Sequence, residues 1–163
     1  MWNNKNKAVT FSFDDGVTQD KRLIEILNKY NLKGTFNINS ALLGLNGELV
    51  CHGVKVSHSK NNASDIKTIY AGHEIAAHSL THPSLTDVND DTIAYQVERD
   101  RLTLSDLCGY EVVGMAYPNG AVDERVVKII KEKTKIKYAR TVKPTDDFNL
   151  QSDLIVFDPT VYY

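Results

Sequence analysis

Short apolar runs alternate with amphipathic segments along most of the chain. The apolar and β-branched runs predict strands at residues 8–13, 34–38, 74–77, 112–117, 138–142 and 154–157. Apolar positions at helical spacing predict helices at residues 23–30, 64–70, 90–108 and 123–133. This alternation predicts an α/β protein with a parallel sheet and covering helices, either an open doubly wound sheet or a (β/α) barrel.

The segment at residues 40–63 shows neither the apolar run of a strand nor the apolar spacing of a helix. It contains Gly44, Gly47 and Gly53, and it ends near the pair Asn61-Asn62. Residues of these types interrupt both helices and strands. The segment is therefore predicted to be a long loop or an inserted hairpin.

Polar residues directly follow three of the predicted strands. Asp14 and Asp15 follow the first strand, and His78 follows the third. The turn at residues 118–120 follows the fourth. The carboxyl ends of parallel strands meet at one edge of the sheet, and ligands bind at that edge in both open sheets and barrels. The sequence therefore predicts one functional site to which all three segments contribute.

Two histidines four positions apart belong to this predicted site. His78 and His82 are separated by one helical turn, or by a tight loop of equivalent reach, so both imidazoles can point at one spot. Two histidines and one carboxylate form a three-ligand site with open positions for water, as in catalytic metal centres. Adjacent strand residues point to opposite sides, so we expect one of Asp14 and Asp15 to bind the metal and the other to move protons.

The segment from His73 to His78 resembles a zinc-protease signature but does not fit it. Its histidines are five positions apart rather than four, which places them about 140° apart on a helix. We therefore expect His73 to be a structural polar group at the start of a strand. His52 and His58 lie in the 40–63 segment and are expected to be solvated.

Composition narrows the class of protein. The chain has 163 residues, 42% of them hydrophobic, and a formal charge of −2 at pH 7. These values predict one globular domain and no nucleic-acid partner. The sequence shows no signal peptide and no apolar run of about 18 residues, which predicts no membrane span and a cytoplasmic location as written, or an extracytoplasmic one after loss of a leader. Cys51 and Cys108 are expected to be reduced, buried thiols, with a single bridge open to an exported protein.

Three segments together resemble the NodB-like polysaccharide deacetylases of carbohydrate esterase family 4. They read Thr10-Phe11-Ser12-Phe13-Asp14-Asp15-Gly16, then Gly72-His73-Glu74-Ile75-Ala76-Ala77-His78-Ser79-Leu80-Thr81-His82-Pro83, and then Ala116-Tyr117-Pro118-Asn119-Gly120. The segment Lys33-Gly34-Thr35-Phe36 also looks like the second strand of that family. These segments follow the family's order over most of residues 8–142. The resemblance implies a distorted, incomplete (β/α) barrel of parallel strands with covering helices.

The resemblance also implies roles for the first two motifs. In that family the first aspartate of the pair is the catalytic base, which is Asp14 here. The second aspartate and the two histidines bind a metal ion, and they correspond to Asp15, His78 and His82. We expect one divalent ion, with Zn²⁺ as the default and Co²⁺, Ni²⁺ or Fe²⁺ as alternatives for such a ligand set.

The third motif implies contacts with the substrate. In the family the residue after the proline donates its backbone N–H to the oxyanion, which points to Asn119. Pro118 and Tyr117 belong to the same substrate-binding motif. For Tyr117 two interpretations are open, because an aromatic ring at this place either stacks on a sugar or packs in the core.

The chain departs from the family pattern at the position of an arginine. The family's third motif commonly carries an arginine that holds the catalytic aspartate, and Ala116 stands at that position here. Either the pKa of Asp14 is higher than in relatives, or another cation such as Arg140 takes the arginine's place.

Two further family motifs have no clear match. The segment Asp146-Asp147-Phe148 is a loose candidate for the fourth motif. The fifth motif supplies a histidine that acts as general acid, but the chain has no histidine after His82. One explanation is that the chain is a shortened version of the family domain. The other is that Tyr162 or Tyr163 occupies the place of the acid. A simpler interpretation of the two tyrosines is that both pack at the terminal strand.

These observations predict a metal-dependent hydrolase that removes N-acetyl groups from sugars or from chitin- or peptidoglycan-like polysaccharides. Two alternatives stay open: hydrolysis of a small amide or imide at the same site, and binding of metal or sugar without turnover. Residues 1–163 are expected to form a single domain that lacks the C-terminal part of the full family domain. Its last strand would then be uncovered and would favour self-association.

Overall fold

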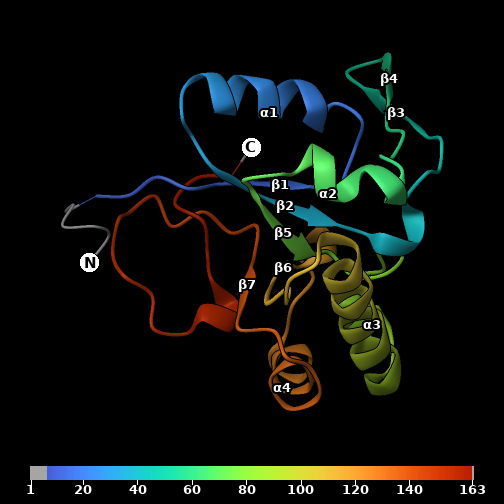
Figure 1. Ribbon diagram of the computed structural model, residues 1–163. Coiled ribbons are helices and arrows are strands. Elements are labelled where there is room, and N and C mark those ends of the chain that lie inside the picture. Colours follow the sequence, from blue (N-terminus) through green and yellow to red (C-terminus); the bar gives the residue numbers. More distant parts are fainter. Residues whose placement is uncertain (1–6, 163) are drawn as a thin grey trace.

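A curved, parallel five-stranded sheet organises the computed structural model, which describes residues 7–162 (Figure 1). The strand order is β1-β2-β5-β6-β7, and every neighbouring pair is parallel. The strands are β1 (Phe11–Asp14), β2 (Gly34–Ile38), β5 (Glu74–Ala77), β6 (Gly114–Ala116) and β7 (Tyr138–Arg140). The sheet forms half of a barrel, which confirms the expectation of an incomplete (β/α) barrel.

Helices lie around the outside of this sheet (Figure 1). They are α1 (Asp20–Lys29), α2 (Ile66–Ile69), α3 (Asp90–Cys108) and α4 (Glu124–Lys133). The side chain of Asn89 accepts a hydrogen bond from Thr92 N at the start of α3, and Gly109 ends that helix with a φ of 84°. The side chain of Asp123 caps α4 in the same way. Over the described residues, no helix is both long enough and apolar enough to cross a membrane.

The 40–63 segment contains an antiparallel hairpin that projects from the body of the molecule (Figure 1). Its strands are β3 (Glu48–Cys51) and β4 (Val54–Ser57), which confirms the alternative of an inserted hairpin. Cys51 lies on this hairpin and is exposed, whereas Cys108 is buried, and both thiols are free. The expectation of two buried thiols is therefore wrong for Cys51.

Short 3₁₀ turns connect several elements and carry the chain away from the strand ends. They are η1 (Ser40–Leu42), η2 (Ala63–Asp65), η3 (Leu85–Asp87), η4 (Pro118–Gly120) and η5 (Leu154–Val156). Between the sheet and the helices lies the core, whose fully buried members include Phe36, Ile38, Ile66, Leu104 and Met115. This packed layer fixes the strands, so the residues that follow them start from a rigid platform.

The last predicted strand does not form. Residues 154–156 form the turn η5, which the side chain of Asp153 caps by accepting a hydrogen bond from Ile155 N at 3.0 Å. Only Phe157 pairs with β7, because its N–H donates to Ala139 O and its carbonyl accepts from Thr141 N, both at 2.9 Å. The strand expected at residues 154–157 is therefore absent, and self-association stays a prediction.

Candidate active site

The aspartate pair lies where β1 ends and the chain turns out of the sheet. Asp14 is the last residue of β1, and Asp15 follows with a φ of 81°, in the left-handed region. Gly16 continues the turn at a φ of 63°, where a Cβ would meet Ile38 at 3.0 Å. The two carboxylates consequently leave the strand end in different directions and have separate partners.

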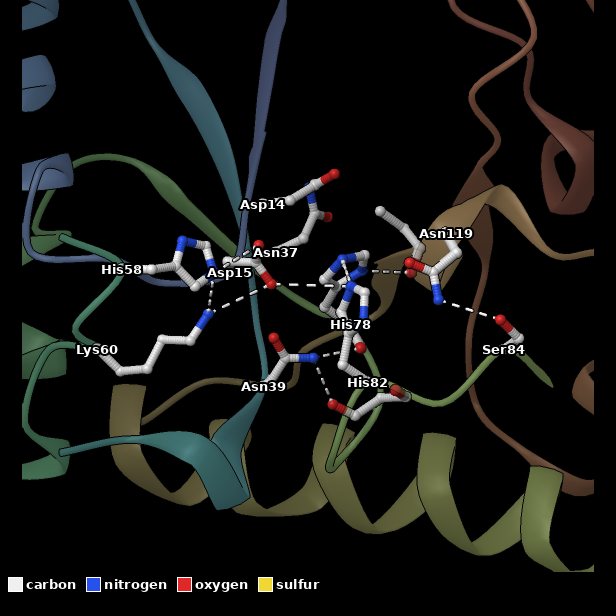
Figure 2. Close-up of polar contacts among 12 residues, drawn as sticks. Asp14, Asp15, Asn37, Asn39, His58, Lys60, His78, His82, Ser84 and Asn119 are labelled. Atoms are coloured by element: carbon white, nitrogen blue, oxygen red, sulfur yellow. Dashed lines mark hydrogen bonds and ion pairs between the residues drawn. The ribbon is translucent and has the colours of Figure 1, made fainter. Parts of the chain in front are cut away.

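The two histidines of the second motif converge on Asp15. Nε2 of His78 and Nε2 of His82 are 3.1 Å apart, and the latter lies 3.8 Å from Oδ1 of Asp15 (Figure 2). One ligand atom from each of the three residues lies within 4.8 Å of the other two. The residues that the sequence assigned to a metal site are therefore together in space.

The neighbours of His78 fix its tautomer. Nδ1 of His78 lies 2.8 Å from the backbone oxygen of Ala116, and a carbonyl only accepts, so Nδ1 carries the proton. Burial lowers the pKa of His78, which favours the neutral ring. The lone pair on Nε2 is consequently directed toward His82 and Asp15, as in a histidine prepared for a metal ion.

This donor set fits a divalent metal ion. It combines two imidazole nitrogens with one carboxylate oxygen, and zinc, cobalt, nickel and iron(II) all accept such ligands. The orientation of His78 by a backbone carbonyl is the kind of outer contact that metal-binding histidines normally have.

Asp15 also contacts two side chains from the segment after the hairpin. His58 Nε2 lies 3.3 Å from Oδ2 of Asp15, and Lys60 Nζ lies 3.4 Å from Oδ1 (Figure 2). The segment is tied to the aspartate turn because Asn61 N donates to Gly16 O at 2.9 Å. The expectation that His58 is solvated is therefore wrong, and sequence reasoning did not find Lys60.

These neighbours determine the charge of Asp15. Burial by itself raises the pKa of this carboxyl, but the Lys60 ammonium and the nearby histidines outweigh that effect and hold the pKa below its ordinary value. Asp15 is therefore ionised at neutral pH and available to a cation.

Asp14 has a different environment, made by an arginine from the opposite edge of the sheet. Arg140 on β7 donates from Nη2 to Oδ1 of Asp14 at 2.5 Å and from Nε to Ser12 Oγ at 3.0 Å. Asn37 Nδ2 donates to the same Oδ1 at 2.8 Å. In the β6–β7 ladder Arg140 pairs in register with Ala116. Of the two alternatives for the missing arginine, the structure has Arg140 as the substitute cation.

The chain matches the family model described as polysaccharide deacetylase over residues 2–138. It belongs to the polysaccharide deacetylase family. A peptidoglycan-N-acetylglucosamine deacetylase of Bacillus cereus is 29% identical over 153 residues, which are 92% of this chain and 50% of that protein. The chain thus spans about half the length of this relative.

Solved structures share the fold of this member of the polysaccharide deacetylase family. The Streptococcus pyogenes deacetylase PplD, in complex with acetate, superposes with a TM-score of 0.78 at 17% identity over 98% of this chain and 66% of that one. BA3943 of Bacillus anthracis, described as a pseudoenzyme of the CE4 family, superposes with a TM-score of 0.62 at 23% identity over 82% of this chain and 43% of that one. A deacetylase and a pseudoenzyme therefore both share the fold of this chain.

The third motif of the chain lies beside the histidines. Asn119 has a φ of 57°, and its side-chain Nδ2 donates to Ser84 Oγ at 3.1 Å (Figure 2). Within the described part of the chain its backbone N–H has no hydrogen-bond partner, so this donor is free. Pro118 is buried directly before it.

Tyr117 does not present a stacking surface. Its side chain is 1% exposed, and its hydroxyl donates to Ile155 O at 2.8 Å. Burial raises the pKa of this hydroxyl. Of the two interpretations, the structure fits core packing, because the ring connects β6 to the turn η5 within the core.

Other candidate residues lie outside the site. His73 accepts a hydrogen bond from Gly34 N at its Nδ1, which confirms a structural role at the start of β5. Among the described residues, Asp147 forms hydrogen bonds only within its own loop, to Thr145 and Asn149.

The tyrosines at the C-terminus were candidates for the general acid. Tyr162 is half-exposed, and its ring lies 5.9 Å from the Arg140 guanidinium carbon, next to the partner of Asp14. Tyr163, the other candidate, lies outside the described residues.

Proposed function

We propose that this polysaccharide deacetylase family member is a metal-dependent hydrolase that removes N-acetyl groups from an N-acetylglucosamine-containing polymer. The observation that carries the proposal is the arrangement of two separate carboxylates at one strand end. Asp15 faces two histidines, and Asp14 faces Arg140. A hydrolase of this kind needs one carboxylate as a ligand and another as a base.

Asp15, His78 and His82 would hold the metal ion, for which zinc is the default. When bound, the ion supplies Lewis-acid chemistry that polarises the acetyl carbonyl and activates water. The neutral imidazole of His78 and the ionised carboxylate of Asp15 are the protonation states in which these groups bind a cation.

Asp14 would accept the proton of the attacking water. Both of its hydrogen-bond donors, Arg140 and Asn37, bind the same oxygen, Oδ1. Within residues 7–162 the other oxygen, Oδ2, has no hydrogen-bond partner. One side of the carboxylate is therefore fixed, and the other is free to take the proton.

The N–H of Asn119 would stabilise the oxyanion that forms on the carbonyl oxygen. This backbone donor is free, and its position is fixed because the Asn119 side chain is held by Ser84. A preorganised donor of this type typically contributes about 3 kcal/mol to the transition state.

A second candidate function is binding of the metal and the polymer without turnover. The description of BA3943 as a pseudoenzyme supports this candidate, because that chain has the same fold.

Acetate release from an N-acetylglucosamine oligomer distinguishes these functions. We expect release by the zinc-loaded protein and none after removal of metal by a chelator. Stoichiometric zinc binding without acetate release would support the binding function instead. Hydrolysis of a small cyclic amide but not of the oligomer would favour the amidase alternative.

A further inference from the structure

Asp100 is a buried carboxylate that none of the steps above uses. It lies on α3, and its residue surface is fully buried. Within residues 7–162 it forms no ion pair with a lysine, arginine or histidine. Burial of such a group is unfavourable unless its oxygens receive hydrogen bonds, so its partners identify what it does.

Both oxygens of Asp100 accept from the backbone at strand ends. Oδ1 accepts from Ser40 N at 2.7 Å, and Oδ2 accepts from His78 N at 2.9 Å, an N–H that is shared with Ile38 O at 3.1 Å. Ser40 begins the turn that follows β2, and His78 follows β5. One carboxylate thus connects α3 to the ends of two neighbouring strands, and one of its partners is the backbone of a metal-site histidine.

The loop that contains both histidines depends on such outside contacts. Ser79 and His82 have φ values of 61° and 62°, in the left-handed region that side chains disfavour. Asn39 Nδ2 donates to the backbone oxygens of His78 and Ser79 (Figure 2). Because the loop has two unfavourable backbone angles, its shape is set by the groups packed against it.

Helix α3 supplies a second contact one turn before Asp100. Gln96 accepts from Leu80 N with its backbone oxygen at 3.1 Å and from Thr81 N with its side-chain oxygen at 3.0 Å. Its side-chain nitrogen donates to Thr81 Oγ1 at 2.9 Å. The histidine loop is therefore attached to one face of α3 through Gln96 and Asp100.

We propose that Asp100 is a positioning residue that holds His78 at the distance and angle required by the divalent cation. This inference rests on the proposed metal site. A carboxylate at this position offers one acceptor oxygen to the N–H of Ser40 and another to the N–H of His78. An asparagine of the same shape would turn its NH₂ toward one of them.

The test compares the zinc affinity of the wild-type protein with that of Asp100→Asn, measured by competition with a chromophoric chelator. Asp106→Asn is the matched control, since Asp106 lies on the same helix but is exposed. We expect Asp100→Asn to bind zinc about 10- to 100-fold more weakly, the usual effect of losing an outer contact to a metal ligand. The absorption spectrum of the cobalt-loaded form should also change in this variant and stay unchanged in the control.

Gln96→Ala provides a second variant in case Asp100→Asn does not fold. It removes the side-chain contacts to Thr81 but keeps the backbone contact to Leu80, so a smaller loss of zinc affinity is expected. Wild-type zinc affinity and an unchanged cobalt spectrum in a folded Asp100→Asn protein would overturn the inference. Where Asp100→Asn does not fold, wild-type affinity in Gln96→Ala would do so. Failure of the wild-type protein itself to bind zinc would instead contradict the metal site on which the proposed function depends.

Discussion

The histidine loop at residues 78–82 and the aspartate turn at residues 14–16 meet at the same site but are held in different ways. The histidine loop is held mainly through its backbone, which accepts a hydrogen bond from Asn39 and donates hydrogen bonds to Gln96 and Asp100. The aspartate turn is held by charged side chains, because Arg140 pairs with Asp14 and Lys60 pairs with Asp15. The loop thus fixes where ligands lie, whereas the turn fixes the charge of the reacting groups.

This difference separates geometry from electrostatics within one site. Hydrogen bonds to buried backbone groups are directional and respond little to salt. Interactions of partly exposed charges weaken with ionic strength, and Asp14 and Asp15 are each about a quarter exposed. Changes on the loop should therefore affect metal affinity first, as should loss of the ligand Asp15, whereas changes around Asp14 should affect turnover first.

The largest effect is expected when the loop loses a ligand. His78→Ala removes one nitrogen of the three-ligand set, and zinc affinity should fall by more than about 100-fold, beyond the effect of losing an outer contact. Chelator competition measures this loss. His52→Ala is the control because His52 is exposed on the hairpin. Equal zinc affinity in His78→Ala and wild type would show that the metal site lies elsewhere.

Loss of the cation beside Asp14 should affect turnover and leave metal binding largely intact. Arg140→Ala removes the cation that fixes Asp14, and kcat should fall about 100-fold, within the range of a general base's contribution. Zinc affinity should change by only a few fold.

The register of β6 and β7 allows a second test of the role of Arg140. Because Ala116 pairs with Arg140, the double variant Ala116→Arg/Arg140→Ala returns the cation to the family's usual position and should recover part of kcat. Arg125→Ala, outside the site, serves as control. Wild-type kcat in Arg140→Ala would show that Asp14 needs no cation.

The stability of the fold is expected to depend on pH through Asp20, which accepts a hydrogen bond from Tyr70 at 2.6 Å. Burial raises the pKa of Asp20 from 3.8 to about 6. A raised acid pKa favours the folded state at low pH, so this contribution is lost as the pH rises from about 4 to about 6. Asp20→Asn should therefore gain stability relative to wild type over that range, by about 3 kcal/mol. Denaturant unfolding of both proteins at pH 4 and pH 7 measures this difference in stability. The same difference at both pH values would be evidence against a raised pKa of Asp20.

The smallest effect is expected at Tyr117, which the structure removes from the substrate side. Tyr117→Phe leaves Ile155 O without its donor, and the free energy of unfolding should decrease by about 1–2 kcal/mol. KM for an oligomer should not change. A large rise in KM in a stably folded variant would return Tyr117 to the binding site.

The sequence predicted the parts of the site that depend on local order along the chain. Asp14, Asp15 and His78 follow parallel strands, and the convergence of strand ends is a general property of such sheets. His82 follows from its spacing to His78. The half-barrel followed from the alternation of strands and helices together with the family resemblance. The hairpin followed from the lack of either pattern at residues 40–63.

The parts that it missed depend on contacts between distant residues. His58 and Lys60 reach Asp15 only because the segment after the hairpin folds back onto Gly16, and no spacing shows this. Arg140 was named only as a possible substitute, since its link to Asp14 joins the two edge strands β7 and β1, which are far apart in the sequence. The strand expected at residues 154–157 failed because Asp153 caps a tight turn there.

The central claim is that the two adjacent aspartates have different tasks. The most direct test measures zinc binding and acetate release from an N-acetylglucosamine oligomer for Asp14→Asn and Asp15→Asn side by side. Asp14→Asn should keep one zinc ion per chain and release no acetate, whereas Asp15→Asn should lose tight zinc binding. Acetate release by Asp14→Asn at the wild-type rate, or tight zinc binding by Asp15→Asn, would contradict this division of roles.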